Sequence, residues 1–170
     1  MYKIIGAKGF IQNIDDFLEK TRIFSEENKV VLQVFDAEVI YDEKHLISAL
    51  INAKRAFDEK KNTTNTLEME ILLYAAGERQ LKLAIPKIGF KKGKVNIAVL
   101  FYDDKNKLDM DFVITKFLKE LDLKKDNKVL KGDINTLKKF GIIDSEIKTV
   151  SEERYSDLIL EKVAMVDIIK

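Results

Sequence analysis

Apolar and polar residues alternate along the chain in a pattern that predicts three strands. β-Branched and aromatic residues dominate residues 2–7 and 30–41, and we expect the second of these strands to be interrupted near Asp36. Residues 95–102 form a continuous apolar run bounded by Lys- and Gly-rich sequence on one side and by acidic residues on the other. Such a run is typical of a central strand that is buried on both faces.

Helical spacing of apolar residues predicts the rest of the regular structure. The helices are expected at residues 13–25, 42–60, 67–76, 79–88, 109–123 and 133–140, and from residue 151 onward. Their first residues include side chains that cap helices, such as Asn13, Asp42 and Asp133, with Thr64 or Thr66 before residue 67. We expect Pro86 to truncate or kink its helix.

These elements predict an α+β fold, with a small central sheet packed by helices and a helical C-terminal part. A length of 170 residues with 46% hydrophobic content suffices for one domain, and no Gly-, Ser- or Pro-rich linker and no internal repeat divides the chain. We therefore expect residues 1–170 to form a single domain. Residues 10–18 should close on its core.

Composition excludes several kinds of chemistry. The chain has no cysteine and one histidine, so disulfides, thiolate metal sites and most zinc or imidazole schemes are excluded, and we expect no cofactor. His45 falls in a first helical turn, where a surface or half-buried imidazole without a role is expected. No apolar run is long enough for a membrane span and the N-terminus does not resemble a signal peptide, so a soluble cytoplasmic protein is expected.

Adjacent acidic residues and glycine-spaced loops offer no catalytic signature. The pairs at residues 15–16, 103–104 and 152–153 lie at the ends of predicted elements, where helix capping or a solvated surface is the expected role. Residues 6–9 and 89–94 lack the strand, glycine pattern and following helix of a nucleotide-phosphate cradle, so we expect turns there.

A local excess of positive charge stands out in a chain whose net charge is +1. No acidic residue occurs from residue 79 to residue 102, whereas six basic residues do: Arg79, Lys82, Lys87, Lys91, Lys92 and Lys94. This set can bind phosphate, with Phe57, Tyr74 or Phe90 nearby to stack a base, or it can be a solvated lysine face. Lysine outnumbers arginine 26 to 4, which suits ion pairing at high temperature in an archaeal or thermophilic protein.

The C-terminal helix carries more apolar residues than one buried stripe needs. Nine of the twelve residues from 158 to 169 are apolar, and they form two stripes. One stripe contains Tyr155, Ile159, Val163 and Val166, and the other contains Leu158, Met165 and Ile168. The second stripe needs further burial within the domain or a partner. If the last six residues formed a strand instead, the same surplus would indicate edge pairing.

The segment Val34-Phe35-Asp36-Ala37, the helix 46–57, the block 67–81 and the strand 96–101 together resemble the small kinase-binding subunit of the KEOPS complex. This family is also called the PRPK-binding proteins, and the resemblance covers most of residues 30–102. It implies a noncatalytic α/β domain that docks on the N-terminal lobe of a small atypical kinase. That kinase contacts the subunit that transfers threonylcarbamoyl to an adenosine beside the tRNA anticodon. The family is also associated with binding the single-stranded 3′ CCA end of tRNA.

Carried onto this sequence, the resemblance implies two sets of site residues. The phosphate ligands of the RNA would be Lys54, Arg55, Lys60, Lys61, Arg79 and Lys82, with Tyr74 and Phe57 as candidates for base contact. Helix periodicity places both aromatic residues in the core by default. The kinase would dock on Leu158, Met165 and Ile168. No metal, cofactor, membrane or small-molecule substrate is implied, and a protein-binding adaptor without RNA affinity or a small nucleotide enzyme remain as alternatives.

Overall fold

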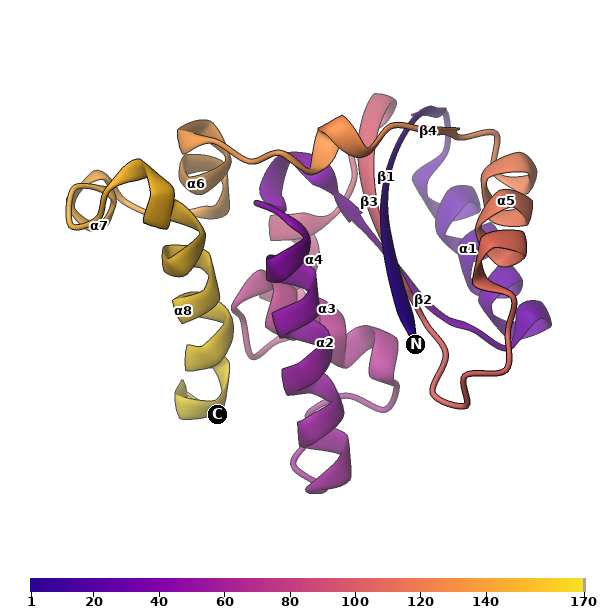
Figure 1. Cartoon of the computed structure of the whole chain (residues 1–170), viewed down its shortest axis with the longest axis horizontal. Helices are drawn as coiled ribbons and strands as arrows, with labels where there is room; N and C mark the ends of the chain where they lie inside the picture. Colours follow the sequence, from indigo (N-terminus) through magenta and orange to yellow (C-terminus); the bar gives the residue numbers. More distant parts are fainter. Residues whose placement is uncertain (170) are drawn as a thin grey trace.

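The computed structural model describes residues 1–169, in which helices cover both faces of a four-stranded antiparallel sheet (Figure 1). The strand order is β2-β3-β1-β4. The strands are β1 (Tyr2–Ile11), β2 (Val31–Asp36), β3 (Gly93–Tyr102) and β4 (Lys124–Lys125). The predicted α+β class is confirmed.

The helices follow the predicted order, with α7 as an additional short helix that was not predicted. They are α1 (Ile14–Asn28), α2 (Glu43–Asp58), α3 (Leu67–Ala76), α4 (Leu81–Ile88), α5 (Met110–Glu120), α6 (Ile134–Phe140), α7 (Asp144–Ile147) and α8 (Tyr155–Ile169). Short 3-10 turns occur at η1 (Ala37–Val39), η2 (Asn127–Leu130) and η3 (Glu152–Arg154). Asn13, Asp42, Thr66 and Asp133 each accept a backbone amide at the start of a helix, as predicted. Thr66, and not Thr64, therefore caps α3.

Strand β3 is the centre of the sheet. It pairs with the whole of β1, from Tyr2 opposite Tyr102 to Ile11 opposite Gly93, and its second half also pairs with β2. Its residues 97–102 are all buried. Because helices cover both faces of this strand, the continuous apolar run is explained, and the predicted central strand is confirmed.

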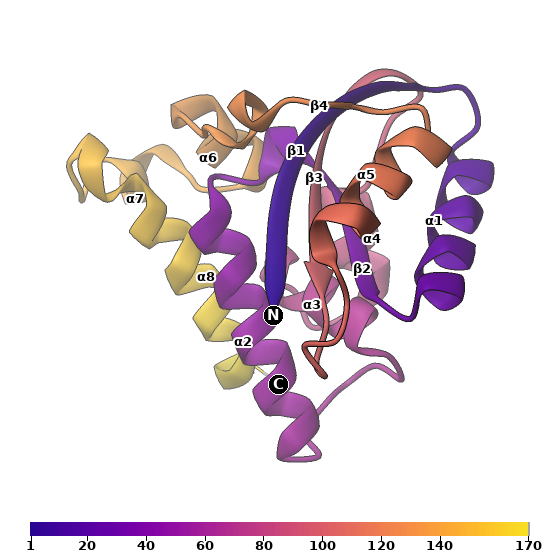
Figure 2. The same ribbon diagram turned by 45° about the vertical axis from the view of Figure 1, so that its right-hand side comes forward.

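Helices lie on both faces of the sheet (Figure 2), and an apolar layer fills the space on each side. Helices α1 and α5 cover one face, where the rings of Phe24 and Phe117 lie 5.3 Å apart in an edge-to-face arrangement. Helices α2, α3 and α4 cover the other face, and α8 packs outside α2 and α3. Helix α3 is buried from Glu70 to Ala76 and is the central helix of this layer.

The N-terminal strand differs from its prediction in two respects. It continues through residues 6–9, so the expected turn there is wrong. Segment 122–129 crosses β1 closely: the Gly6 oxygen accepts the Asp126 amide at 2.8 Å, and a Cβ on Gly6 would lie 2.5 Å from the Asp126 oxygen. Residues 10–18 close on the core only in part, because Phe10 is 69% exposed and Leu18 is also exposed.

His45 also differs from its prediction, because its side chain is completely buried. The Tyr41 amide donates to His45 Nδ1 at 3.3 Å, and His45 Nε2 lies 2.8 Å from the Ala75 oxygen. The ring therefore carries its proton on Nε2 and bridges the start of α2 to the end of α3. Burial lowers the pKa of His45 to about 4. We find that this imidazole is a neutral part of the core.

Candidate RNA and partner interface

Helix α4 presents basic and apolar side chains to solvent next to one another. Gly77, in the left-handed conformation at φ 65°, ends α3, and α4 begins after Gln80. Only Ala84 and Ile88 of α4 are buried, whereas Leu83 is 51% and Ile85 is 49% exposed. Pro86 lies inside the helix, which ends two residues later, in agreement with the predicted truncation.

The two basic residues at the start of this helix are available to a ligand. Arg79 and Lys82 are exposed, and neither forms an ion pair within residues 1–169. Lys87, at the other end of α4, already has partners within the protein. It pairs with Glu78 at 3.3 Å and lies 4.1 Å from the ring centroid of Phe140, and burial lowers its pKa. The free positive charge of α4 therefore lies at its N-terminal end.

Three other predicted phosphate ligands are engaged by carboxylates. Lys54 pairs with Asp104 at 2.8 Å, and that hydrogen bond is the main cause that raises the pKa of the lysine. The remaining two pairs are Arg55 with Asp167 and Lys61 with Glu59. Lys60, next to this group, is exposed and has a positive φ of 57°. An RNA phosphate would have to compete with these carboxylates for Lys54, Arg55 and Lys61.

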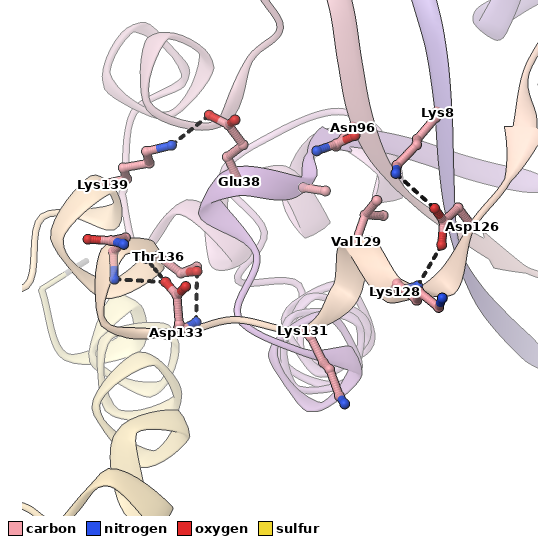
Figure 3. Close-up of a pocket in the computed structure, with 12 residues that line it drawn as sticks. Lys8, Glu38, Asn96, Asp126, Lys128, Val129, Lys131, Asp133, Thr136 and Lys139 are labelled. Carbon is pink, nitrogen blue, oxygen red and sulfur yellow. Dashed lines mark hydrogen bonds and ion pairs between the residues drawn. The ribbon is translucent and has the colours of Figure 1, made fainter.

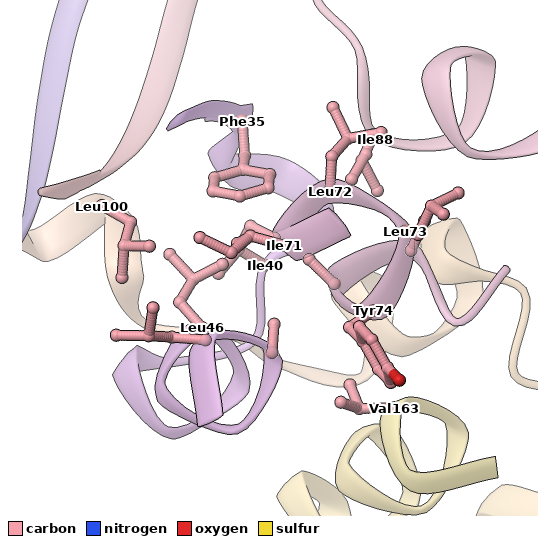
Figure 4. Packing of buried hydrophobic residues seen from close by; sticks show 14 of the residues in the cluster. Phe35, Ile40, Leu46, Ile71, Leu72, Leu73, Tyr74, Ile88, Leu100 and Val163 are labelled. Atoms are coloured by element: carbon pink, nitrogen blue, oxygen red, sulfur yellow. The ribbon is translucent and has the colours of Figure 1, made fainter. Parts of the chain in front are cut away.

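Tyr74 lies in the core and presents no face to an RNA base. Its ring is fully buried and points toward Val163 of α8 (Figure 4). Its hydroxyl donates a hydrogen bond to Asp167. Burial is the first cause that raises the pKa of this hydroxyl. Tyr74 is buried because neighbouring helices enclose α3. This agrees with the core position that helix periodicity predicts for it. Phe57 is half-buried on α2.

Helix α8 buries most of one predicted apolar stripe and part of the other. Ile159, Val163 and Val166 are buried, as one stripe predicts. Leu158 is buried as well, because it belongs to a small apolar cluster with Leu137, Phe140, Ile142, Ile147 and Ile159. The expectation that Leu158 faces a partner is therefore corrected. Met165 and Ile168 are exposed, the latter at 77%, and the C-terminal end is helical.

Leu83 and Ile85 were missed by sequence reasoning. The signal was present, because α4 is apolar at six of its eight positions and a helix that packs on one side cannot bury them all.

No helix of residues 1–169 has the length and apolarity that crossing a bilayer requires. In the same range, no three His, Asp or Glu side chains are grouped so as to hold a metal ion.

Comparison with known sequences identifies the family. The profile of the family described as "Kinase binding protein CGI-121" matches residues 11–167. The chain belongs to this family. The resemblance seen in the sequence is thereby confirmed, and the match extends from the end of β1 to Asp167 in α8.

Two relatives in this family are similar to different extents. The chain is 38% identical to the KEOPS complex subunit Cgi121 of Pyrococcus abyssi over 81 residues, which span 48% of this chain and 47% of that protein. It is 27% identical to the regulatory protein Cgi121 of Methanocaldococcus jannaschii over 140 residues, which span 81% of this chain and 84% of that protein. The first match thus spans about half the length of its relative, and the second spans most of it.

Proposed function

We propose that this chain is a noncatalytic subunit of a KEOPS complex, which carries out threonylcarbamoyladenosine modification of tRNA. In that complex it would bind the small atypical kinase subunit and the single-stranded 3′ CCA end of tRNA. The CGI-121 family description and the names of the two relatives, a KEOPS subunit and a regulatory protein, support the kinase partner and the noncatalytic role.

The observation that carries the RNA part of the proposal is the surface of α4. Arg79 lies just before α4 and Lys82 lies in its first turn, and both supply positive charge that no carboxylate pairs within residues 1–169. The exposed side chains of Leu83 and Ile85 supply apolar contact in the same helix. A single-stranded end offers both partners that such a surface needs, because its phosphates are charged and its bases are unstacked. Lys60 is a further exposed cation.

The kinase is assigned to the exposed end of α8. Met165 and Ile168 are apolar, exposed and one helical turn apart, and an exposed apolar group of this kind is typical of a protein contact. The buried residues Val163 and Val166 fix the orientation of α8 on α2 and α3, so the outer stripe is presented on a rigid support.

Binding of tRNA with and without its terminal CCA tests the RNA proposal. We expect intact tRNA to bind at least about tenfold more tightly, and we expect the double variant Arg79→Glu/Lys82→Glu to lose most of this difference. The double variant Lys105→Glu/Lys119→Glu is a matched control, because it reverses two exposed lysines elsewhere. Equal affinity for both tRNAs, or an equal loss in the control, would contradict the proposal.

A protein-binding adaptor without RNA affinity is the second candidate. It is favoured by the carboxylates that already pair with Lys54, Arg55 and Lys61. Capture of the kinase by the chain, combined with no measurable tRNA binding at low salt, would establish this alternative.

A further inference from the structure

One end of the sheet carries an uncovered row of polar and aromatic side chains. Lys8 and Phe10 of β1 are two residues apart and therefore share a face of the sheet. Across the ladders, Lys8 pairs with Asn96 of β3 and with Lys124 of β4, and Phe10 pairs with Lys94. We call the set Lys8, Phe10, Lys94, Asn96 and Lys124 the sheet platform.

The platform begins where the core ends. On the same face of β1, Ile4 packs against the core and Gly6 is buried under segment 126–129, whereas Lys8 and Phe10 are exposed. Phe10 keeps 69% of its surface in water, which is unusual for a phenylalanine on a ten-residue strand that pairs along its full length. An exposed aromatic ring on a flat strand surface is suited to stacking against a nucleobase.

The charges of the platform favour an anionic ligand. Lys8 and Lys124 lie directly opposite each other, and like charges in that position destabilise a sheet. Asp126 offsets the charge of Lys8, because its Oδ2 lies 2.9 Å from the Lys8 Nζ. Lys94 and Lys124 form no ion pair within residues 1–169. Lysines that protect an exposed sheet edge explain β4. They explain Lys94 as well, because β2 pairs with β3 only over residues 97–102 and residues 93–96 have β1 alone beside them. They do not explain the exposed ring of Phe10, which lies opposite Lys94.

Two adjoining hollows of about 430 and 720 Å³ extend the platform. They share the lining residues Lys8, Glu38 and Asn96, so they lie side by side. Figure 3 shows the smaller hollow, with the ion pairs Lys8–Asp126 and Lys139–Glu38 on its two sides. The same hollow is lined by Lys128 and Lys131, which also have no ion-pair partner in the described part of the chain. The hollows are also lined by four carboxylates: Glu38, Asp122, Asp126 and Asp133. Glu38 and Asp126 are paired with Lys139 and Lys8, so Lys94, Lys124, Lys128 and Lys131 remain as cations without an ion pair in residues 1–169, beside an exposed ring.

We propose that the sheet platform and its hollows bind a single-stranded nucleic acid segment. A base would stack on Phe10, and the phosphodiester groups would be held by Lys94, Lys124, Lys128 and Lys131. This site uses none of the residues of α4 and goes beyond the proposed function, because it does not depend on a CCA end. It gives the chain a second contact with RNA.

A fluorescent uridine octamer, which contains no CCA, is the probe that tests the platform by anisotropy. We expect Phe10→Ala to weaken binding roughly tenfold, the typical loss for one stacked base. Phe112→Ala is the matched control, because Phe112 is a similarly exposed ring, at 66%, on the helix α5. Equal effects of the two substitutions, or no binding by the unaltered chain at low salt, would overturn the proposal. Thermal melts of both variants verify that they are folded.

The lysines are tested by salt dependence. We expect Lys94→Ala/Lys124→Ala to reduce the slope of log affinity against log salt by about 1.4, since each phosphate contact on a single strand contributes about 0.7. An unchanged slope would overturn the assignment of these lysines. Competition with inorganic pyrophosphate distinguishes the ligand class, and displacement of the octamer by equal concentrations of pyrophosphate would overturn nucleic acid binding.

The platform and the α4 surface can fail separately. If the platform is correct, Arg79→Glu/Lys82→Glu retains most of its octamer affinity even where CCA discrimination is lost. If that variant abolishes octamer binding while Phe10→Ala leaves it unchanged, the platform is overturned and the α4 proposal stands.

Discussion

The Tyr74 hydroxyl donates a hydrogen bond to Asp167 and so connects the central helix α3 to the C-terminal helix α8. Asp167 also pairs with Arg55 of α2, so one carboxylate joins three helices. The surface that we assign to the kinase lies on the same helix, at Met165 and Ile168. The orientation of that surface therefore depends on a polar contact at the edge of the core.

Removal of the Tyr74 hydroxyl tests this connection. We expect Tyr74→Phe to lower the free energy of unfolding by about 1.5–3 kcal/mol, because the hydrogen bond has a charged acceptor. Amide exchange should become faster in residues 155–169 than in β3. Tyr2→Phe is the control, because Tyr2 is exposed and its hydroxyl forms no hydrogen bond within residues 1–169. Denaturation curves that shift equally for both variants would contradict this role of Tyr74.

A charge at Ile168 should disrupt kinase binding without affecting the fold. Ile168 is largely exposed, so Ile168→Glu leaves the core intact, but it places a carboxylate in the proposed apolar contact. We expect a loss of at least about tenfold in affinity for the purified kinase subunit, measured by biolayer interferometry. Ile143→Glu alters an exposed isoleucine between α6 and α7 and should have no effect. A similar loss for both variants would argue against a docking surface on α8.

The buried histidine should make stability depend on pH. The pKa of His45 is lowered from its ordinary value of 6.5 to about 4 in the folded chain. Between these values the unfolded chain binds a proton that the folded chain does not, so stability is complete above pH 6.5 and falls as the pH falls toward 4. At pH 4.5 the loss from this group is about 2–3 kcal/mol.

Urea denaturation at pH 7.5 and pH 4.5 measures this loss. We expect the difference in unfolding free energy between the two pH values to be smaller in His45→Gln than in the unaltered chain. Other acidic groups contribute equally to both proteins, so they cancel in the comparison. An identical pH dependence in the two proteins would show that His45 does not titrate as its burial indicates.

Two glycines of β1 offer a matched test of how segment 122–129 is held. A Cβ on Gly6 would lie 2.5 Å from the Asp126 backbone oxygen, whereas one on Gly9 would lie 2.5 Å from the terminal Cδ2 of Leu123. A side-chain methyl can rotate away and a backbone oxygen cannot. We expect Gly6→Ala to destabilise the chain by about 2–3 kcal/mol and Gly9→Ala by about 1 kcal/mol or less. The reverse order in thermal denaturation would contradict this reading of the crossing.

Much of the secondary structure could be predicted because its causes are local. The side chains of Asn13, Asp42 and Asp133 satisfy amides within three residues of themselves, so the sequence specifies where these helices begin. The continuous apolar run of β3 likewise predicts burial on both faces, whatever its neighbours are. The family also follows from sequence, because the family profile that matches residues 11–167 uses the amino-acid sequence alone.

The candidate site could be predicted only in part. Arg79 and Lys82 are exposed as expected, but the sequence could not show that Arg55 meets Asp167, which lies 112 residues away. For the same reason Tyr74, on the enclosed helix α3, could not be separated from residues that face solvent. Pairing of charges between distant elements depends on how the helices pack.

The sequence by itself determined the elements, their caps, the absence of cysteine and the position of the basic residues along the chain. Only the tertiary structure decided that Leu158 and His45 are buried and that Phe10 is exposed. The reason is physical: periodicity indicates which face of an element is apolar, but burial depends on whether another element covers that face. At Phe10 no helix covers the apolar residue, and this is where the proposed platform lies.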